Sequence, residues 1–305
     1  DVVVLENVEP PAAAAGFEST LTCTTTCLFR FAVGTVQQFE STLTCTTTST
    51  DLNIDGSSVG TEYSYEWTTN GGLILSGSDT PVPTVGDPGV YDLLVTNNST
   101  GCTNTASVQV PEDVTPPAAA TAVAGELTCS VTTLPLSSAG SSTGTQYNYL
   151  WTTTTGHILS DNTVPVPVVD DAGTYQLRVT NSINGCTSIS SVDVDQNVSL
   201  PQVNASVNSL LTCAITQIQL QGTATGGAQG VSYAWSGPGI VSGGTSATPT
   251  IDSTGQYLLT ATDLYNGCIA SDPVTVTADV TPPVIAIASP AQLNCYVAQT
   301  IIPGS

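Results

Sequence analysis

Cysteine, tryptophan and tyrosine recur at fixed offsets, and this spacing constrains the fold more than any other feature of the chain. Cys45, Cys129 and Cys213 follow one another at intervals of 84 residues, and a Trp stands 22 residues after each. Each Trp is followed by a Tyr and, 11 residues after that Tyr, by a second Cys. Three copies of such a pattern predict a tandem repeat of about 84 residues. The later members of the pattern are Trp67, Trp151 and Trp235, then Tyr91, Tyr175 and Tyr257, then Cys102, Cys186 and Cys268.

The residues between these markers have the pattern of β-strands. Segments such as YSYEW, YDLLV and YQLRV alternate with a period of two, and Thr and β-branched residues dominate. Clusters of Asn, Gly and Pro interrupt them every 8 to 12 residues. About seven short strands in about 84 residues is the size of an immunoglobulin-like sandwich. We therefore predict an all-β chain of tandem immunoglobulin-like β-sandwich modules, each with one disulfide.

The repeat also predicts the division of the chain. Its modules are joined by short linkers that carry Pro, which favours a semi-rigid rod. The predicted segments are the last strand and linker of a preceding repeat (1–11), repeat 1 (12–112), repeat 2 (113–197), repeat 3 (198–279) and the first strands of an incomplete further repeat (280–305).

Each module is expected to be held by a core and a disulfide. The Trp should anchor the core, and the Tyr should occupy the corner position at which an immunoglobulin tyrosine bonds back to the backbone. Nine cysteines without metal-ligand spacing indicate disulfides and an oxidising compartment. The second Cys should lie in the turn that closes the last hairpin. We predict the pairs Cys45–Cys102, Cys129–Cys186 and Cys213–Cys268, each contributing about 4 kcal/mol in the chain-entropy model.

The first repeat and the two ends depart from the pattern. FESTLTCTTT occurs at 17–26 and again at 39–48, so 22 residues are duplicated. This insert is an extra hairpin or contact patch, with a Cys23–Cys27 bridge as one option, or an error in the sequence. The incomplete ends, which leave Cys295 without a partner in the repeat pattern, fit either a longer repeat array or subunits that complete one another by strand addition.

One segment matches a calcium-binding loop. Asp51, Asn53, Asp55-Gly56 and Glu62 fit the pattern D-x-N-x-D-G-x₅-E, whose oxygen ligands suit Ca²⁺. The other repeats place a strand and turn at this position, and an EF-hand needs flanking helices. A Ca²⁺ site and a solvated strand edge are therefore both retained, and no other cofactor is expected.

Composition excludes several classes of function. The chain has 24 Asp and Glu against 2 Arg and Lys together, with a net charge of −22, which argues against binding to nucleic acid or to anionic membranes. No segment has the roughly 20 apolar residues of a membrane span. His157 is the only histidine, and no catalytic triad, phosphate loop or HExxH motif surrounds it. We predict that the chain is not an enzyme.

The repeat unit LTC…YxW…GxYxLxVTNxxxGC, followed by a Pro linker, resembles the immunoglobulin-like and PKD-like repeats of large surface and secreted proteins of Bacteroidota-type bacteria. The resemblance covers nearly the whole chain apart from the insert, and it implies a secreted, cell-surface stalk, adhesin or fibre without catalytic residues in its repeats. We therefore expect a structural protein that self-associates into a fibre or surface layer. The alternatives are an array that binds glycans or proteins, and the non-catalytic spacer of a secreted enzyme.

Overall fold

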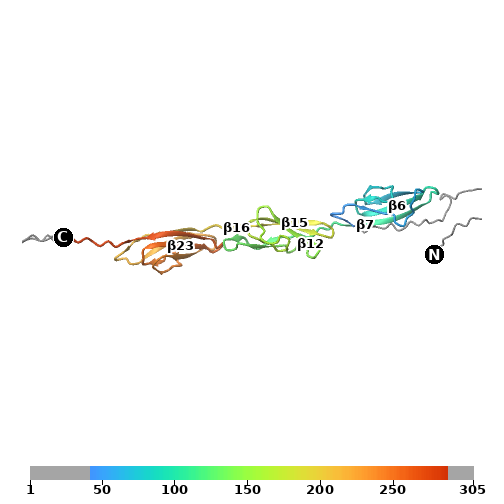
Figure 1. Cartoon of the computed structure of the whole chain (residues 1–305). Coiled ribbons are helices and arrows are strands. Elements are labelled where there is room, and N and C mark those ends of the chain that lie inside the picture. The colour runs from blue at the N-terminus through green and yellow to red at the C-terminus, as the bar shows by residue number, and fades with distance from the viewer. Residues whose placement is uncertain (1–41, 288–305) are drawn as a thin grey trace, which may run out of the picture.

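The computed structural model describes residues 42–287, which form three β-sandwich modules arranged end to end as a rod (Figure 1). Strands and turns make up this part of the chain, and it contains no helix, so the prediction of an all-β fold is confirmed. Residues 1–41 and 288–305 lie outside the described residues. The predictions for segment 1–11, for most of the insert and for Cys23, Cys27 and Cys295 therefore fall outside them too.

The third module shows the complete strand order of one repeat. One sheet has the order β17-β19-β22-β21 and the other has the order β20-β23-β24. These are the ABED and CFG sheets of a seven-stranded immunoglobulin sandwich. The remaining two strands, β18 and β25, pair in parallel at the end of the module. The bounds are β17 Gln202–Val207, β18 Leu211–Thr212, β19 Ile218–Thr225, β20 Val231–Ser236, β21 Ile240–Ser242, β22 Thr250–Ile251, β23 Gly255–Asp263, β24 Ile269–Val276 and β25 Ala278–Asp279.

The second module repeats this plan. Its sheets have the orders β13-β11-β9 and β12-β14-β15, and β10 pairs in parallel with β16. An isolated bridge between Ile158 and Val169 takes the place of the strand that corresponds to β21. The bounds are β9 Ala122–Val123, β10 Leu127–Thr128, β11 Leu134–Ser137, β12 Tyr147–Thr153, β13 Val168–Val169, β14 Gly173–Asn181, β15 Thr187–Val194 and β16 Gln196–Asn197.

The first module is described from the equivalent of β18 onward. Its sheets have the orders β2-β5-β4 and β3-β6-β7, and β1 pairs in parallel with β8. The predicted border between residues 112 and 113 falls inside β8, so this border lies within a module junction. The bounds are β1 Leu43–Thr44, β2 Thr50–Asp51, β3 Tyr63–Asn70, β4 Ile74–Ser76, β5 Thr84–Val85, β6 Gly89–Asn97, β7 Thr103–Val110 and β8 Glu112–Asp113.

Alternating side chains build one core in each module. In β14, Tyr175, Leu177 and Val179 are fully buried, while the residues between them are exposed. This is the period of two expected for a strand with one face in the core. The three Trp and the three corner Tyr of the repeat are all buried: Trp67, Trp151 and Trp235, and Tyr91, Tyr175 and Tyr257.

The corner tyrosines bond back to the backbone in all three modules. The Tyr175 hydroxyl donates to the carbonyl of Asp171 at 2.6 Å and accepts from the amide of His157 at 3.0 Å. Tyr91 and Tyr257 make the same return to the residue four positions earlier, at 2.6 Å each. Burial raises the pKa of Tyr175 and Tyr257, because removal from water disfavours the phenolate.

Candidate functional site: the module junctions

The first cysteine of each repeat lies in a turn at the end of the module where its two short parallel strands pair. In the first module, β1 pairs in parallel with β8, with Thr44 opposite Asp113. The Thr44 hydroxyl then accepts from the amides of Thr46 and Thr47 at 3.3 and 3.0 Å, which shapes the turn around Cys45. Such bonds from a Thr hydroxyl to backbone two and three residues on are typical of tight polar turns. The second module has the same turn around Cys129.

The second cysteine lies at the opposite end of its module, in the turn between the last two long strands. Between β14 and β15 this turn contains Asn184, Gly185 and Cys186, and the Gly185 amide donates to the carbonyl of Asn181 at 2.8 Å. Gly185 has a φ of +70°, in the left-handed region that glycine adopts without strain. The predicted position of the second cysteine in this hairpin is correct.

The Asn side chain of this hairpin bonds to the linker that leads into its own module. The Asn184 side-chain amide donates to Asp113 Oδ1 at 3.1 Å and to the carbonyl of Thr115 at 3.0 Å. Its Oδ1 accepts from the amide of Cys186 at 3.0 Å, so this buried side chain uses both its amide group and its oxygen.

Asn266 repeats the arrangement at the next junction. Its amide donates to Asn197 Oδ1 at 3.1 Å and to the carbonyl of Ser199 at 2.9 Å. The two junctions therefore use the same bonds, with Asp113 in one and Asn197 in the other.

The disulfides join consecutive modules, so the predicted pairing within modules is wrong. Cys45 of the first module bonds to Cys186 of the second, with their Cα atoms 5.1 Å apart. Cys129 of the second module bonds to Cys268 of the third, with their Cα atoms 5.0 Å apart. Cys102 is also disulfide-bonded, whereas Cys213 is an exposed free thiol.

The strand layout explains why the two repeat cysteines of one module cannot form a disulfide with each other. In the second module Cys129 follows β10, which lies beside β16, whereas Cys186 precedes β15. The eight-residue strand β15 separates the two ends and is about 26 Å long at ~3.3 Å per residue. A disulfide needs Cα atoms within about 7 Å. Only the adjacent module brings a suitable cysteine within reach.

Close packing and polar contacts complete each junction. A Cβ atom on Gly185 would lie 2.7 Å from Thr46 Oγ1 of the first module, and one on Gly267 would lie 2.6 Å from Ser130 Cβ of the second. The Tyr265 hydroxyl donates to Glu126 Oε1 at 2.7 Å across the second junction. The same carboxylate raises the pKa of Tyr265. The modules therefore meet through backbone, side-chain and covalent contacts together.

Among the calcium-loop residues, Asp51 lies on β2, Asn53 lies between β2 and the next turn, and Asp55 and Gly56 lie in that turn. Leu52 and Ile54 point into the core, and Asp51 accepts from the Thr84 hydroxyl at 2.7 Å. Asn53 Oδ1 accepts from the amide of Asp55 at 3.1 Å, and Glu62 lies beyond the turn near Gly60. Over residues 42–287, no three His, Cys, Asp or Glu side chains gather in a way that could hold a metal ion.

His157 and two tyrosines near the tryptophans also have structural partners. His157 is exposed and pairs with Asp170 at 2.7 Å. Tyr65 and Tyr149 are half-buried against their cores and donate to the carbonyls of Ser58 and Ser142. The part of the chain that the structure describes contains no helix that could span a membrane.

The strand order and the junctions define a class: a tandem array of immunoglobulin-like sandwiches joined by disulfides between modules. No protein-family model matches the chain, and no curated protein matches it in sequence. Among solved structures, extracellular domains 3–5 of Drosophila OTK share 10% identity over 76% of this chain and 92% of that chain, with a TM-score of 0.28.

Two further arrays give similar values. Three N-terminal domains of the bacteriophage RB49 outer capsid protein Hoc share 12% identity over 78% of this chain and 95% of that chain, with a TM-score of 0.28. The N-terminal eight Ig domains of Down Syndrome Cell Adhesion Molecule share 13% identity over 81% of this chain and 42% of that chain, with a TM-score of 0.32. The assignment to the immunoglobulin-like class therefore rests on the strand order of the chain itself.

Proposed function

We propose that the chain is part of an extracellular structural protein, a stalk or fibre whose modules are linked so that they carry load along their length. The single observation behind the proposal is the pairing of Cys45 with Cys186 and of Cys129 with Cys268, which connects each module to the next. A disulfide inside a module stabilises only that module. A disulfide between modules adds a second covalent connection beside the linker, so tension is shared by both.

The environment implied by these bonds supports an extracellular location. Disulfides persist in oxidising compartments and are rare in the cytosol. The charge of −22, with no Lys, keeps such a rod soluble and disfavours contact with anionic surfaces. We also propose that the rods associate into a fibre or surface layer, and that they have no enzymatic role.

Immunoelectron microscopy of the cells that make the protein tests this function. Antibodies raised against residues 42–287 should label extended structures outside the cell, and antibodies pre-absorbed with the same protein serve as the control. Label confined to the cytoplasm would contradict the proposal. So would purified rods that stay monomeric while binding a defined glycan on an array, because that result favours the binding-module alternative.

A further inference from the structure

The free end of the third module has the same structure as the two ends that already hold a neighbour. At this end β18 pairs in parallel with β25, with Thr212 opposite Asp279, as Thr44 lies opposite Asp113 in the first module. The Thr212 hydroxyl accepts from the amides of Ala214 and Ile215 at 3.2 and 2.9 Å, which repeats the cysteine turn. Cys213 at its centre is an exposed thiol.

The acceptors for a hairpin asparagine are also in place. Asp279 Oδ1 accepts from the amide of Thr281 at 3.1 Å, as Asp113 Oδ1 does from Thr115 at 3.2 Å. At the first junction this carboxylate and the Thr115 carbonyl receive the Asn184 side chain. Asp279 and the Thr281 carbonyl are their equivalents at the free end.

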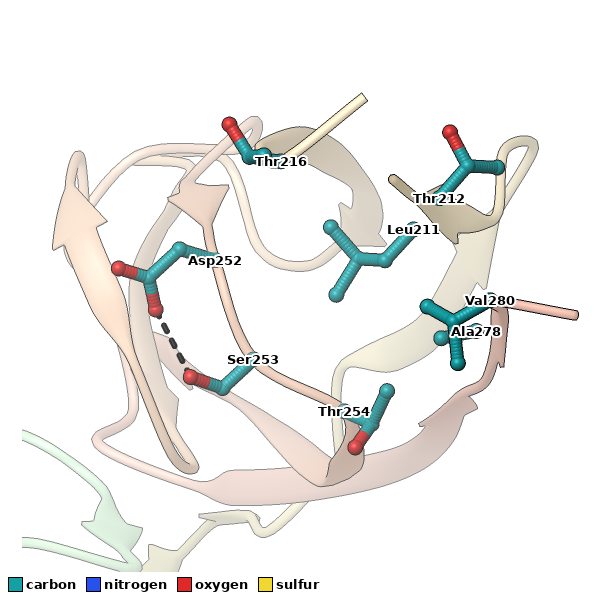
Figure 2. A pocket seen from close by; sticks show the side chains of 8 residues that line it. All are labelled: Leu211, Thr212, Thr216, Asp252, Ser253, Thr254, Ala278 and Val280. Atoms are coloured by element: carbon teal, nitrogen blue, oxygen red, sulfur yellow. Dashed lines mark hydrogen bonds between the residues drawn. The ribbon is translucent and has the colours of Figure 1, made fainter. Parts of the chain in front are cut away.

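An open pocket of about 420 Å³ lies beside β18 and β25 at this end. Figure 2 shows the side chains that line it. The Leu211 side chain projects into the pocket, Ala278 and Val280 line one side, and Asp252 and Ser253 lie across from them. The pocket lies next to the turn that carries Cys213, so part of this end is an accessible concave surface.

Apolar residues that follow β25 are exposed. Val284, Ile285 and Ile287 are 95%, 83% and 89% exposed. In the third module the equivalent positions of Ile285 and Ile287 are Val203 and Ala205, which pack against the core. Exposed apolar residues that are clustered in this way mark a contact surface, and the third module covers the equivalent residues with its own core.

We infer that Cys213 and the surface around it form a covalent docking site for the Asn-Gly-Cys hairpin of a fourth sandwich module, one that follows the third in the same polypeptide. A second copy of this chain is not expected to bind covalently at this site. Its hairpin cysteines, Cys102, Cys186 and Cys268, are all disulfide-bonded already. The inference rests on the junction geometry and does not depend on the role of the rod as a stalk.

The bond forms by thiol–disulfide exchange with an oxidant of the disulfide class. The Cys213 thiolate attacks a sulfur of the oxidant, and one oxidant sulfur leaves as a thiolate. The thiolate of the incoming cysteine then attacks the Cys213 sulfur and releases the second oxidant sulfur. Two thiols lose two protons and two electrons, and the oxidant disulfide gains them.

Disulfide mapping of the native secreted protein tests the inference. Free thiols are alkylated, and the protein is digested with an Asp-specific protease, because residues 1–305 contain no Lys. We expect the peptide that carries Cys213 to be joined to a peptide with the sequence Asn-Gly-Cys, and the intact protein to run as a monomer on a non-reducing gel. Alkylated Cys213, a pair between two Cys213 residues, or a ladder of covalent oligomers would each overturn it.

A peptide probe tests the site separately. The 305-residue chain is equilibrated in a glutathione buffer with the peptide of residues 181–188 and with its Asn184→Ala analogue. The Asn peptide should form at least several-fold more mixed disulfide at Cys213, because its side-chain amide can donate two hydrogen bonds that the Ala analogue cannot make. The Cys213→Ser variant gives the background. Equal amounts of mixed disulfide with both peptides would contradict a specific docking site for the hairpin.

Discussion

At the scale of single residues, two repeat positions differ between modules: the hydrogen bond of the core tryptophan, and the linker residue that accepts from the hairpin asparagine. Trp67 Nε1 donates to the carbonyl of Thr80 and Trp235 Nε1 to that of Ser246, both at 3.0 Å. Trp151 Nε1 is buried without a partner. At the junctions, Asp113 and Asn197 occupy the same position, but only Asp113 titrates.

The tryptophans should therefore respond unequally to replacement by Phe. Trp67→Phe and Trp235→Phe remove the indole hydrogen bond to a backbone carbonyl, which adds a cost of about 1 kcal/mol to the loss of packing. Trp151→Phe loses packing only and should destabilise its module least. Hydrogen exchange measured on peptides from each module gives the change in the free energy of unfolding for each variant. Equal losses in all three modules would contradict the role of the indole bonds.

Asp113 supports a prediction about pH. The Asn184 side-chain amide, helped by Thr115, holds the pKa of Asp113 below its ordinary value. A depressed pKa gives stability that is present above the ordinary value and is lost as the pH falls through the folded pKa. Asn184→Ala should move the pKa of Asp113 back toward the ordinary range in a ¹³C NMR titration. Asp161, whose pKa is lowered by Thr163, should not move and serves as the control.

At the scale of elements, the hairpin between β14 and β15 carries the junction. Its glycine has two roles, since it provides a positive φ and leaves room for Thr46 of the neighbouring module. Gly125 also has a positive φ, of +100°, but a Cβ there would meet nothing within 4 Å. A comparison of Gly185 with Gly125 therefore separates the effect of backbone strain from the effect of the contact between modules.

Gly185→Ala should reduce formation of the Cys45–Cys186 bond several-fold after refolding in a glutathione buffer. Both this variant and Gly125→Ala carry a left-handed penalty of about 1–2 kcal/mol. Only Gly185→Ala also collides with the first module, so only it should leave the two cysteines open to alkylation. The Cys129–Cys268 bond reports on the unaffected junction. A similar loss in both variants would mean that strain alone decides the outcome.

The elements also show what the sequence could predict. The period-two pattern and the Trp and Tyr spacing led to the sandwich, the cores and the hairpin position of the second cysteine. The pairing was missed because Cys102 and Cys186 stand at equivalent repeat positions. Choosing between them requires the parallel pairing of two-residue strands such as β10 and β16, which leave no pattern in the sequence. Within the calcium pattern, Asp51 lies on β2, and the buried Leu52 and Ile54 alternate with Asn53 and Asp55.

The asparagines of the junctions also have a signal in the sequence. Asn184 and Asn266 both precede Gly-Cys, and the matching linkers carry Asp113 and Asn197 at the same position. A polar acceptor and an amide repeated together indicate a bond between them. The first module has Thr100 in place of this asparagine.

At the scale of the whole molecule, two connections at each junction should limit bending. In the double variant Cys45→Ser/Cys186→Ser the linker and the bonds of Asn184 remain, but the covalent bridge does not. Negative-stain electron microscopy should show a broader range of angles between the first and second modules. The angle between the second and third modules should keep its range and is the control in the same particle. Unchanged angles at both junctions would show that noncovalent packing alone sets the stiffness.

The two disulfides close overlapping loops, from residue 45 to residue 186 and from residue 129 to residue 268. Every peptide bond between residues 45 and 268 therefore lies inside at least one loop. A protease that cuts the backbone once anywhere in this range leaves a single covalent molecule, because a disulfide bypasses the cut. Extended along an array, this overlap would let an exposed rod survive isolated nicks that would sever an ordinary string of domains.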